Sequence, residues 1–289
     1  MSEATVVAQL GSPLRRRRGF VAIVRTPGGA VGFVLVGLAV MVGLLAGPLA
    51  GGDPFAAVAA PLAPPSALHL FGTDDLGRDL AALVVHGLRT SLVIGAAVGV
   101  VAGLIGIAVG AVSGSRGGWV DEMLMHATEL VQVVPRFFFA VVVVAFFGSG
   151  LVNLILLLGL TSWPWTARVV RAEVLSLKRR DFVSAARSLG ASEMRVLLRH
   201  LVPNALPAAV VMVTLVASSA ILIEAGLGFV GLTDPDVVSL GYLANNAQRF
   251  LRLAWWMVLF PGMAIVLLVV GLNLLGDAVN ELLNPWEEP

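Results

Sequence analysis

Long stretches without a charged residue constrain this chain more than any other feature. Five of them have 24 residues or more, at residues 26–52, 90–115, 137–167, 200–223 and 253–276. Each is as long as, or longer than, the roughly 20 apolar residues that a helix needs to cross a bilayer. Only 13% of the residues are charged, whereas soluble domains carry about 25%. We therefore expect an all-α membrane protein, since only lipid can cover so much apolar surface.

The third stretch is too long for one ordinary helix, and it predicts a hairpin. Gly148, Ser149 and Gly150 interrupt it with a turn signal. The helix after the turn is expected at about 151–170. The helix before it is expected to begin near His126 and to kink at Pro135. Two charged residues, Glu129 and Arg136, then lie in or near the membrane.

Basic residues predict six spans with both termini in the cytoplasm. Cytoplasmic loops are enriched in Lys and Arg, and six spans put fourteen basic residues on one side against four on the other. The apolar stretch at 26–52 is also longer than the apolar core of a cleaved signal peptide, which has about 7–15 residues. We divide the chain into a basic cytoplasmic segment (1–27), a first span with an external loop (28–88) and a five-helix core (89–289).

Residues 181–204 predict two short helices joined by a turn on the cytoplasmic side. An apolar stripe recurs at three- and four-residue spacing, as on one helix face, and consists of Phe182, Ala185, Ala186 and Leu189. Gly190 suits the left-handed position that ends a helix, and Ser192 suits the cap of the next one. Asp181 is expected to cap the first helix. Periodicity alone also fits an amphipathic pair lying on the bilayer, with arginines toward lipid phosphates.

The same segment resembles the EAA loop of ABC importer membrane subunits. That pattern is Glu-Ala-Ala, three residues, Gly, nine residues, Ile, any residue and Leu-Pro. Four positions match, namely Ala185, Ala186, Gly190 and Pro203, and three differ, namely Ser184 for Glu, His200 for Ile and Val202 for Leu. Serine is too short to complete a capping box with the helix start. We expect a cost of about 0.5–1 kcal/mol in helix-end stability.

Three further segments resemble the C-type permeases of the oligopeptide/dipeptide/nickel group. They are Phe-Gly-Thr-Asp-Asp-Leu-Gly-Arg-Asp at 71–79, Glu-Ala-Gly-Leu-Gly-Phe-Val-Gly-Leu at 224–232, and Asn-Leu-Leu-Gly-Asp at 273–277 with Asn-Pro at 284–285. The resemblance covers nearly all of residues 20–286. It implies the type I importer permease fold, also called MetI-like, with six transmembrane helices, in the inner membrane of a bacterium.

The resemblance also implies a function and a set of partners. The chain would form half of a translocation pathway for dipeptides or oligopeptides, beside a second permease of the B type and an external substrate-binding protein. One or two cytoplasmic ATPases would hold ATP and Mg²⁺, and this chain would hold no cofactor. The residues that would dock the ATPase are Asp181, Ser184, Ala185, Ala186, Arg187, Leu189, Gly190, Ala191, Ser192 and Arg195.

The sequence contains no catalytic constellation of its own. Lys178 is the one lysine and follows no glycine-rich phosphate loop, so this chain is not the ATPase. The absence of cysteine excludes disulfides, Cys-ligated zinc, iron–sulfur clusters and thiol nucleophiles. His126 and Glu129 can share a helix face but lack a third metal ligand. A turn and a helix cap, and not a cation site, are expected from Asp74, Asp75 and Asp79. A net charge of +1 argues against a nucleic-acid partner.

Four residues are candidates for the pathway or its gate: Glu129, Arg136, Trp163 and Glu224. Charged groups inside a membrane are costly and are usually functional or paired. The alternatives are contacts with neighbouring helices for Glu129 and Arg136, packing for Trp163, and interfacial exposure for Glu224. Three other functions remain open: a permease for nickel or another small solute, an ion-coupled secondary transporter that uses Glu129 and Arg136, and a scaffold without transport.

Overall fold

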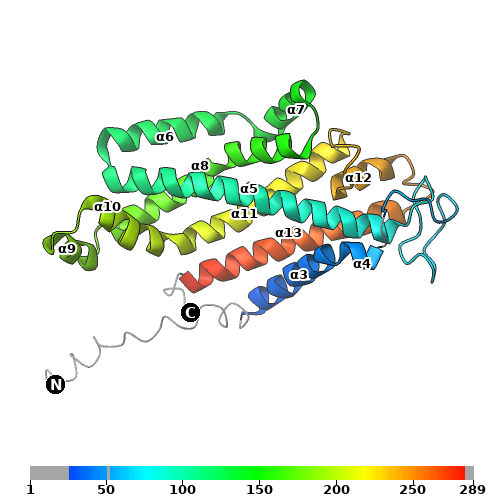
Figure 1. The fold of residues 1–289 in the computed structure, drawn as a ribbon, viewed down its shortest axis with the longest axis horizontal. Helices are drawn as coiled ribbons and strands as arrows, with labels where there is room; N and C mark the ends of the chain where they lie inside the picture. The colour runs from blue at the N-terminus through cyan, green and yellow to red at the C-terminus, as the bar shows by residue number, and fades with distance from the viewer. Residues whose placement is uncertain (1–25, 51–52, 284–289) are drawn as a thin grey trace, which may run out of the picture.

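The computed structural model describes residues 26–50 and 53–283 as a bundle of long helices (Figure 1). In chain order they are α3 (Pro27–Leu44), α4 (Ala46–Ala50), α5 (Leu80–Arg116), α6 (Gly118–Val133), α7 (Arg136–Phe147), α8 (Leu151–Leu177), α9 (Asp181–Ser188), α10 (Glu193–Val196), the π-helical turn η1 (Leu197–Leu201), α11 (Val202–Phe229), α12 (Leu240–Gln248) and α13 (Trp256–Leu283). The predicted basic segment lies almost wholly outside the described residues, as does the Asn-Pro pair at 284–285.

Four helices of the described chain are long and apolar enough to cross a membrane. They are α3, α5, the continuous helix from α10 to α11, and α13. The pair α6 and α7 gives a fifth candidate, because its two helices qualify together although they bend by 72°. The helix α8 is as long as α13 but more polar, with Thr161, Ser162 and Thr166 near its middle. The all-helical prediction is confirmed, and the described helices account for four or five spans.

The helix α5 lies at the centre of the bundle because its glycines let neighbouring backbones approach. A Cβ at Gly110 would stand 2.4 Å from the carbonyl oxygen of Ala167 in α8, and one at Gly106 would stand 2.5 Å from Thr166 Cβ. Gly103 meets Val213 of α11 in the same way. Small residues commonly allow such contact between membrane helices. In Figure 1 α5, α8 and α11 form the middle of the bundle, α3 and α13 flank one side, and α6 flanks the other.

The hairpin predicted at Gly148–Gly150 is confirmed. The prediction for the helix before the turn is wrong. Gly148 has a φ of +87° and ends α7, and α8 begins at Leu151. The helix before the turn does not begin near His126, because α6 already starts at Gly118. Pro135 produces a complete break and not a kink, since it follows an extended Val134 and precedes the first residue of α7. Two further bounds differ from expectation, because α5 begins at Leu80 and α8 continues to Leu177.

The two ends of the bundle are built from different segments. The helices α9 and α10 lie at one end, and the loop at 53–79 lies with α12 at the other (Figure 1). A hydrophobic cluster beneath α9 and α10 joins Val183, Val196 and Leu201 to Val174 of α8 and Ala205 of α11. A second cluster at the opposite end joins α5, α12 and α13. Each end is therefore packed on the long helices and does not stand apart from them.

Candidate functional site

The segment 181–201 folds as the predicted pair of short helices around a turn. Gly190 has a φ of +81°, and the N–H of Ala191 bonds back to the carbonyl oxygen of Ala186 at 3.1 Å. Ser192 caps α10 by accepting a hydrogen bond from the N–H of Arg195 at 3.4 Å. The helix end at Gly190 and the cap at Ser192 are thus confirmed.

The predicted cap at Asp181 is wrong. Arg180 occupies the extended cap position of α9, with no side-chain hydrogen bond, and Asp181 is the first helical residue. Its carboxylate still lies near the positive end of the helix dipole. Ser184 is the fourth helical residue, so a glutamate there would stand one position beyond the one that a capping box requires. The capping cost expected from Ser184 therefore does not follow from this geometry.

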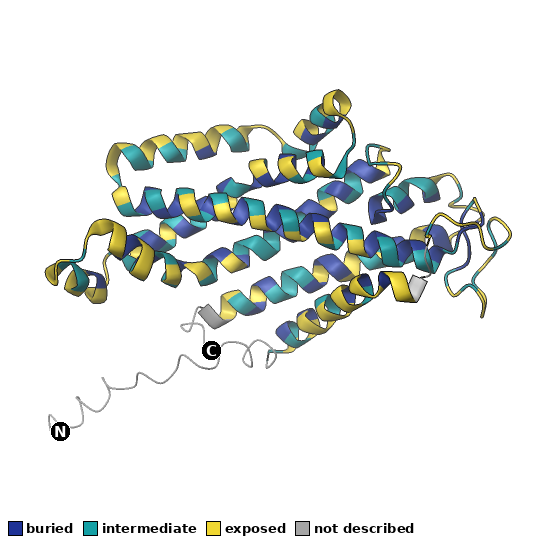
Figure 2. Cartoon of the chain, in the orientation of Figure 1, coloured by how far each residue is buried: buried dark blue, intermediate teal, exposed yellow. Residues whose placement is uncertain are grey.

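One face of this segment packs against the bundle, and the other is left open. Val183, Val196 and Leu197 are buried. Leu189 is 89% exposed at the turn, and three more large apolar residues of the segment are exposed, namely Phe182, Met194 and Leu198. Figure 2 shows α9 as mostly exposed surface at the tip of the bundle. Ser184, Ala185, Gly190, Ser192 and Arg195 are also exposed, while Ala186, Arg187 and Ala191 are half-buried.

An ion pair ties the two limbs of the segment together. Arg187 Nε donates to Glu193 Oε1 at 2.8 Å, and Arg187 Nη2 donates to Oε2 at 3.0 Å. These hydrogen bonds to Glu193 raise the pKa of Arg187 above its ordinary value. Sequence reasoning named Arg187 but missed Glu193. A signal was available, because an acid placed just after a helix-ending Gly190 can fold back on a base at the end of α9.

The segment is also joined mechanically to two long helices. A short turn at 178–180 links α9 to α8, and α10 runs through η1 into α11 as one helix from Glu193 to Phe229. The π-helical turn sits just before Pro203, and such turns often occur at functional positions. A force applied to α9 and α10 would therefore reach both α8 and α11.

The 71–79 segment builds the opposite end, and most of its residues are buried in its own chain. Asp74 accepts hydrogen bonds from the backbone N–H of Leu76 at 2.9 Å and of Arg78 at 2.8 Å. Arg78 Nε donates to Asp74 Oδ2 at 2.5 Å, and both side chains are 3% exposed. Burial acts to lower the pKa of Arg78, but hydrogen bonds to Tyr242 and Asp74 raise it overall. Asp79 caps α5 by accepting from the N–H of Ala82 at 3.0 Å. The predicted turn and cap are confirmed.

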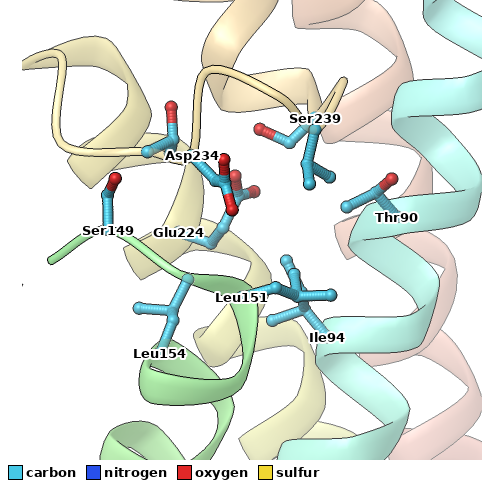
Figure 3. Close-up of a pocket in the computed structure, with 10 residues that line it drawn as sticks. Thr90, Ile94, Ser149, Leu151, Leu154, Glu224, Asp234 and Ser239 are labelled. Atoms are coloured by element: carbon cyan, nitrogen blue, oxygen red, sulfur yellow. The ribbon is translucent and has the colours of Figure 1, made fainter.

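Glu224 lies inside the protein, so interfacial exposure is wrong. Its side chain is 1% exposed, and its Oε2 lies 3.5 Å from Ser91 Oγ of α5. It borders a cavity of about 20 Å³ together with Thr90, Asp234 and Ser239, which Figure 3 shows around it. Its Oε1 has no hydrogen-bond partner among the described residues. The carboxylate therefore lies where α5, α11 and the start of α12 meet.

Arg136 is half-buried and lies at the break between α6 and α7. Its Nη1 donates to Ser162 Oγ of α8 at 3.2 Å. It borders one cavity of about 430 Å³ against α8 and a second of about 230 Å³ against α11. Sequence reasoning missed Thr161 and Ser162, although two neighbouring hydroxyls in the middle of an apolar helix are a usable signal.

The structure does not bring the other predicted pathway residues together around Arg136. Glu129 is exposed on α6, on the far side of the 72° break. Trp163 is half-buried and packs in the cluster formed by α5, α7, α8 and α11. Within the described residues, no three His, Asp or Glu side chains gather as they would around a metal ion.

Comparison with known proteins identifies the family. Residues 106–288 match the family described as "Binding-protein-dependent transport system inner membrane component". The chain belongs to this family. It is accordingly a multi-pass protein of the bacterial inner membrane and a transport subunit.

Named relatives and a solved structure agree with this membership. A putative peptide transport system permease protein of Brucella suis biovar 1 is 36% identical over 277 residues, which are 94% of this chain and 89% of that protein. The dipeptide transport system permease protein DppC of Alkalihalophilus pseudofirmus is 35% identical over 76% of this chain and 73% of its own. An inward-facing MetNI methionine ABC transporter chain superposes with a TM-score of 0.57 at 22% identity, over 70% of this chain and 95% of that chain. The fold is thus MetI-like.

Proposed function

We propose that this chain is the C-type permease subunit of an ATP-driven peptide importer and forms half of its translocation pathway. Support comes from several relatives, 35–38% identical, whose names describe peptide or dipeptide permeases. A second permease of the B type completes the pathway, and an external binding protein delivers the peptide. ATP and Mg²⁺ are bound by the cytoplasmic ATPases, since the sequence has no phosphate loop.

The proposed topology has six spans with both termini in the cytoplasm. It counts α8 as a span and the bent pair α6 and α7 as another. The arrangement of the helices supports it, because the 53–79 loop and α12 lie at one end and α9 and α10 at the other (Figure 1). The uneven distribution of basic residues supports the same orientation.

The absence of native cysteine makes this topology simple to test. In intact cells, a membrane-impermeant maleimide should label Leu68→Cys in the 53–79 loop. Leu189→Cys in the segment 181–201 should react only after the cells are permeabilised. Labelling of Leu189→Cys in intact cells would overturn the orientation.

The exposed apolar face of the segment 181–201 is the single observation that carries the coupling mechanism. Leu189, Phe182, Met194 and Leu198 expose apolar surface at the tip of the bundle, and exposed apolar patches mark interaction sites. Closure of the ATPases around ATP pulls on this segment. Because it is continuous with α11 and linked to α8, these two helices move as rigid bodies and expose the pathway alternately to each side.

Uptake by the reconstituted complex tests the proposed function. The permease pair, the ATPases and the binding protein are placed in proteoliposomes, and uptake of labelled tripeptide is measured. We expect uptake with ATP and Mg²⁺, and none when an ion gradient replaces ATP. Uptake driven by the gradient alone would favour a secondary transporter. Uptake of Ni²⁺ without peptide would favour a metal permease, and no uptake of any solute would favour a scaffold.

A further inference from the structure

Arg136 is a charged residue at mid-depth of the bundle, and none of the described residues gives it an acidic partner. Among the described residues, no carboxylate oxygen lies within 4.0 Å of its guanidinium, and Ser162 Oγ is the one side-chain acceptor that it reaches. Ser162 lies near the middle of α8 (Leu151–Leu177). An arginine at such depth is costly unless it faces a counter-charge or a water-filled path. The side chain therefore lies where an anion would be strongly favoured.

Cavities border Arg136 on two sides and are apolar apart from a few hydroxyl groups. The larger, of about 430 Å³, has Val134, Phe139 and Leu157 in its wall with Thr161 as a hydroxyl group. The smaller, of about 230 Å³, has Trp165 and Met212 in its wall with Ser219. An apolar space of this size with few polar groups is typical of a site for a small organic ligand. An acidic side chain that merely paired with Arg136 would need far less space than these cavities provide.

The local backbone adds to the positive potential around the guanidinium. Arg136 is the first residue of α7, and no side chain caps that helix start. Its first N–H groups therefore lack intrahelical partners and carry the positive end of the helix dipole. Val134 is extended and borders the larger cavity. Irregular backbone at membrane depth is tolerated where it borders a cavity.

We propose that Arg136 binds the terminal carboxylate of the transported peptide during its passage. The inference rests on the proposed function and names one group in the pathway that binds the peptide. Every free peptide carries one such carboxylate whatever its side chains are, so one guanidinium in an apolar wall recognises peptides without selecting their sequence. Arginine suits this role because its planar fork binds a carboxylate through two hydrogen bonds. Ser162 orients the fork.

Matched peptides separate this role from a structural one. Initial uptake of trialanine and of trialanine amide is measured in proteoliposomes that hold the complete importer. The Arg136→Gln variant should lower trialanine uptake about tenfold or more, since a charged hydrogen bond is lost. Uptake of the amide should change less than twofold, and Arg136→Lys should restore only part of the trialanine uptake, because lysine keeps the charge but not the planar fork. The control Arg252→Gln, at an exposed site near α13, should leave both uptakes unchanged.

A protection experiment keeps the proposal falsifiable if the binding protein rejects the amide. Thr161→Cys places a single thiol in the larger cavity beside Arg136. Saturating trialanine should slow its alkylation by N-ethylmaleimide about threefold or more in the assembled complex. The protection should disappear when Arg136→Gln is added. Protection that survives this substitution, or no protection at all, would overturn the assignment.

The outcomes also distinguish the assignment from the proposed function. Equal loss of both peptides in Arg136→Gln would mean that Arg136 is paired with an acidic residue of the second permease, and only the carboxylate assignment would fail. A wild-type complex that takes up neither peptide with ATP would refute the importer function itself.

Discussion

The segments 71–79 and 181–201 lie at opposite ends of the bundle and differ in what they do with their motif residues. The first buries them, with Asp74 and Arg78 each 3% exposed and Thr73 fully covered. The second exposes them, with Leu189 at 89%. Both segments resemble family motifs, so a motif alone does not indicate whether its residues hold the fold or meet a partner. Burial separates the two cases.

Two glycines, one in each segment, show the same difference between a buried and an open position. Gly77 and Gly190 share a left-handed backbone, with φ values of +75° and +81°. A Cβ at Gly77 would stand 2.2 Å from the carbonyl oxygen of Ala59, whereas one at Gly190 would meet no heavy atom of the described residues within 4 Å. Gly77 is thus required both by close packing and by its positive φ. Gly190 is required only by its positive φ, because the surface around it is open.

The largest effect on stability is expected from breaking the buried ion pair of the 71–79 segment. Asp74→Ala leaves Arg78 buried without its carboxylate and should lower the free energy of unfolding by about 3–5 kcal/mol. Thermal unfolding of the purified chain in detergent measures it. Asp236→Ala, at an exposed aspartate, is the control and should cost less than about 1 kcal/mol. Equal effects of the two substitutions would contradict the structural role of this end.

A pair of glycine substitutions compares the two segments further, with losses in unfolding free energy of intermediate size. Gly77→Ala adds a backbone clash to an unfavourable φ and should cost more than about 2 kcal/mol. Gly190→Ala meets only the unfavourable φ and should cost about 1 kcal/mol. The same unfolding assay compares them. A larger loss at Gly190 than at Gly77 would mean that the segment 181–201 is specified by internal packing.

The smallest effect is expected from the exposed ion pair of the segment 181–201. Arg187→Gln removes the bidentate contact with Glu193, whose side chain is 69% exposed, and should cost about 0.2–1 kcal/mol. Added salt should reduce the difference from wild type, because it screens exposed charges. A salt-independent loss above about 2 kcal/mol would show that this pair stabilises the fold and not just the turn.

Several local features were predictable because they depend on residues close in sequence. The turn at Gly148, the helix end at Gly190 and the caps by Ser192 and Asp79 all follow from short-range chemistry. Other features depend on packing between distant segments. The burial of Arg78 is one, since its guanidinium also donates to Tyr242 Oη of α12.

Three misses have particular physical reasons. Arg180 is the N-cap of α9 because the turn after α8 spans only residues 178–180, so Asp181 is already the first helical residue. The break at Pro135 exceeds a kink because the proline ring disfavours a helical conformation in the residue before it, and Val134 is extended. The burial of Glu224 could not be predicted, since it depends on the contact of Gly228 with Gly241, where a Cβ at Gly228 would stand 2.4 Å from the Gly241 backbone.

The central claim is tested most directly by adding one charge at the tip of the segment 181–201 and measuring how much ATPase still co-purifies. Leu189→Glu should fold normally, since the side chain is 89% exposed, and should reduce ATPase co-purification about tenfold or more, because burying a leucine contributes about 1.5–3 kcal/mol. Leu68→Glu makes the same change at an equally exposed leucine, also 89%, in the 53–79 loop and should retain the ATPase fully. Full retention by Leu189→Glu, or equal loss in both variants, would contradict the account.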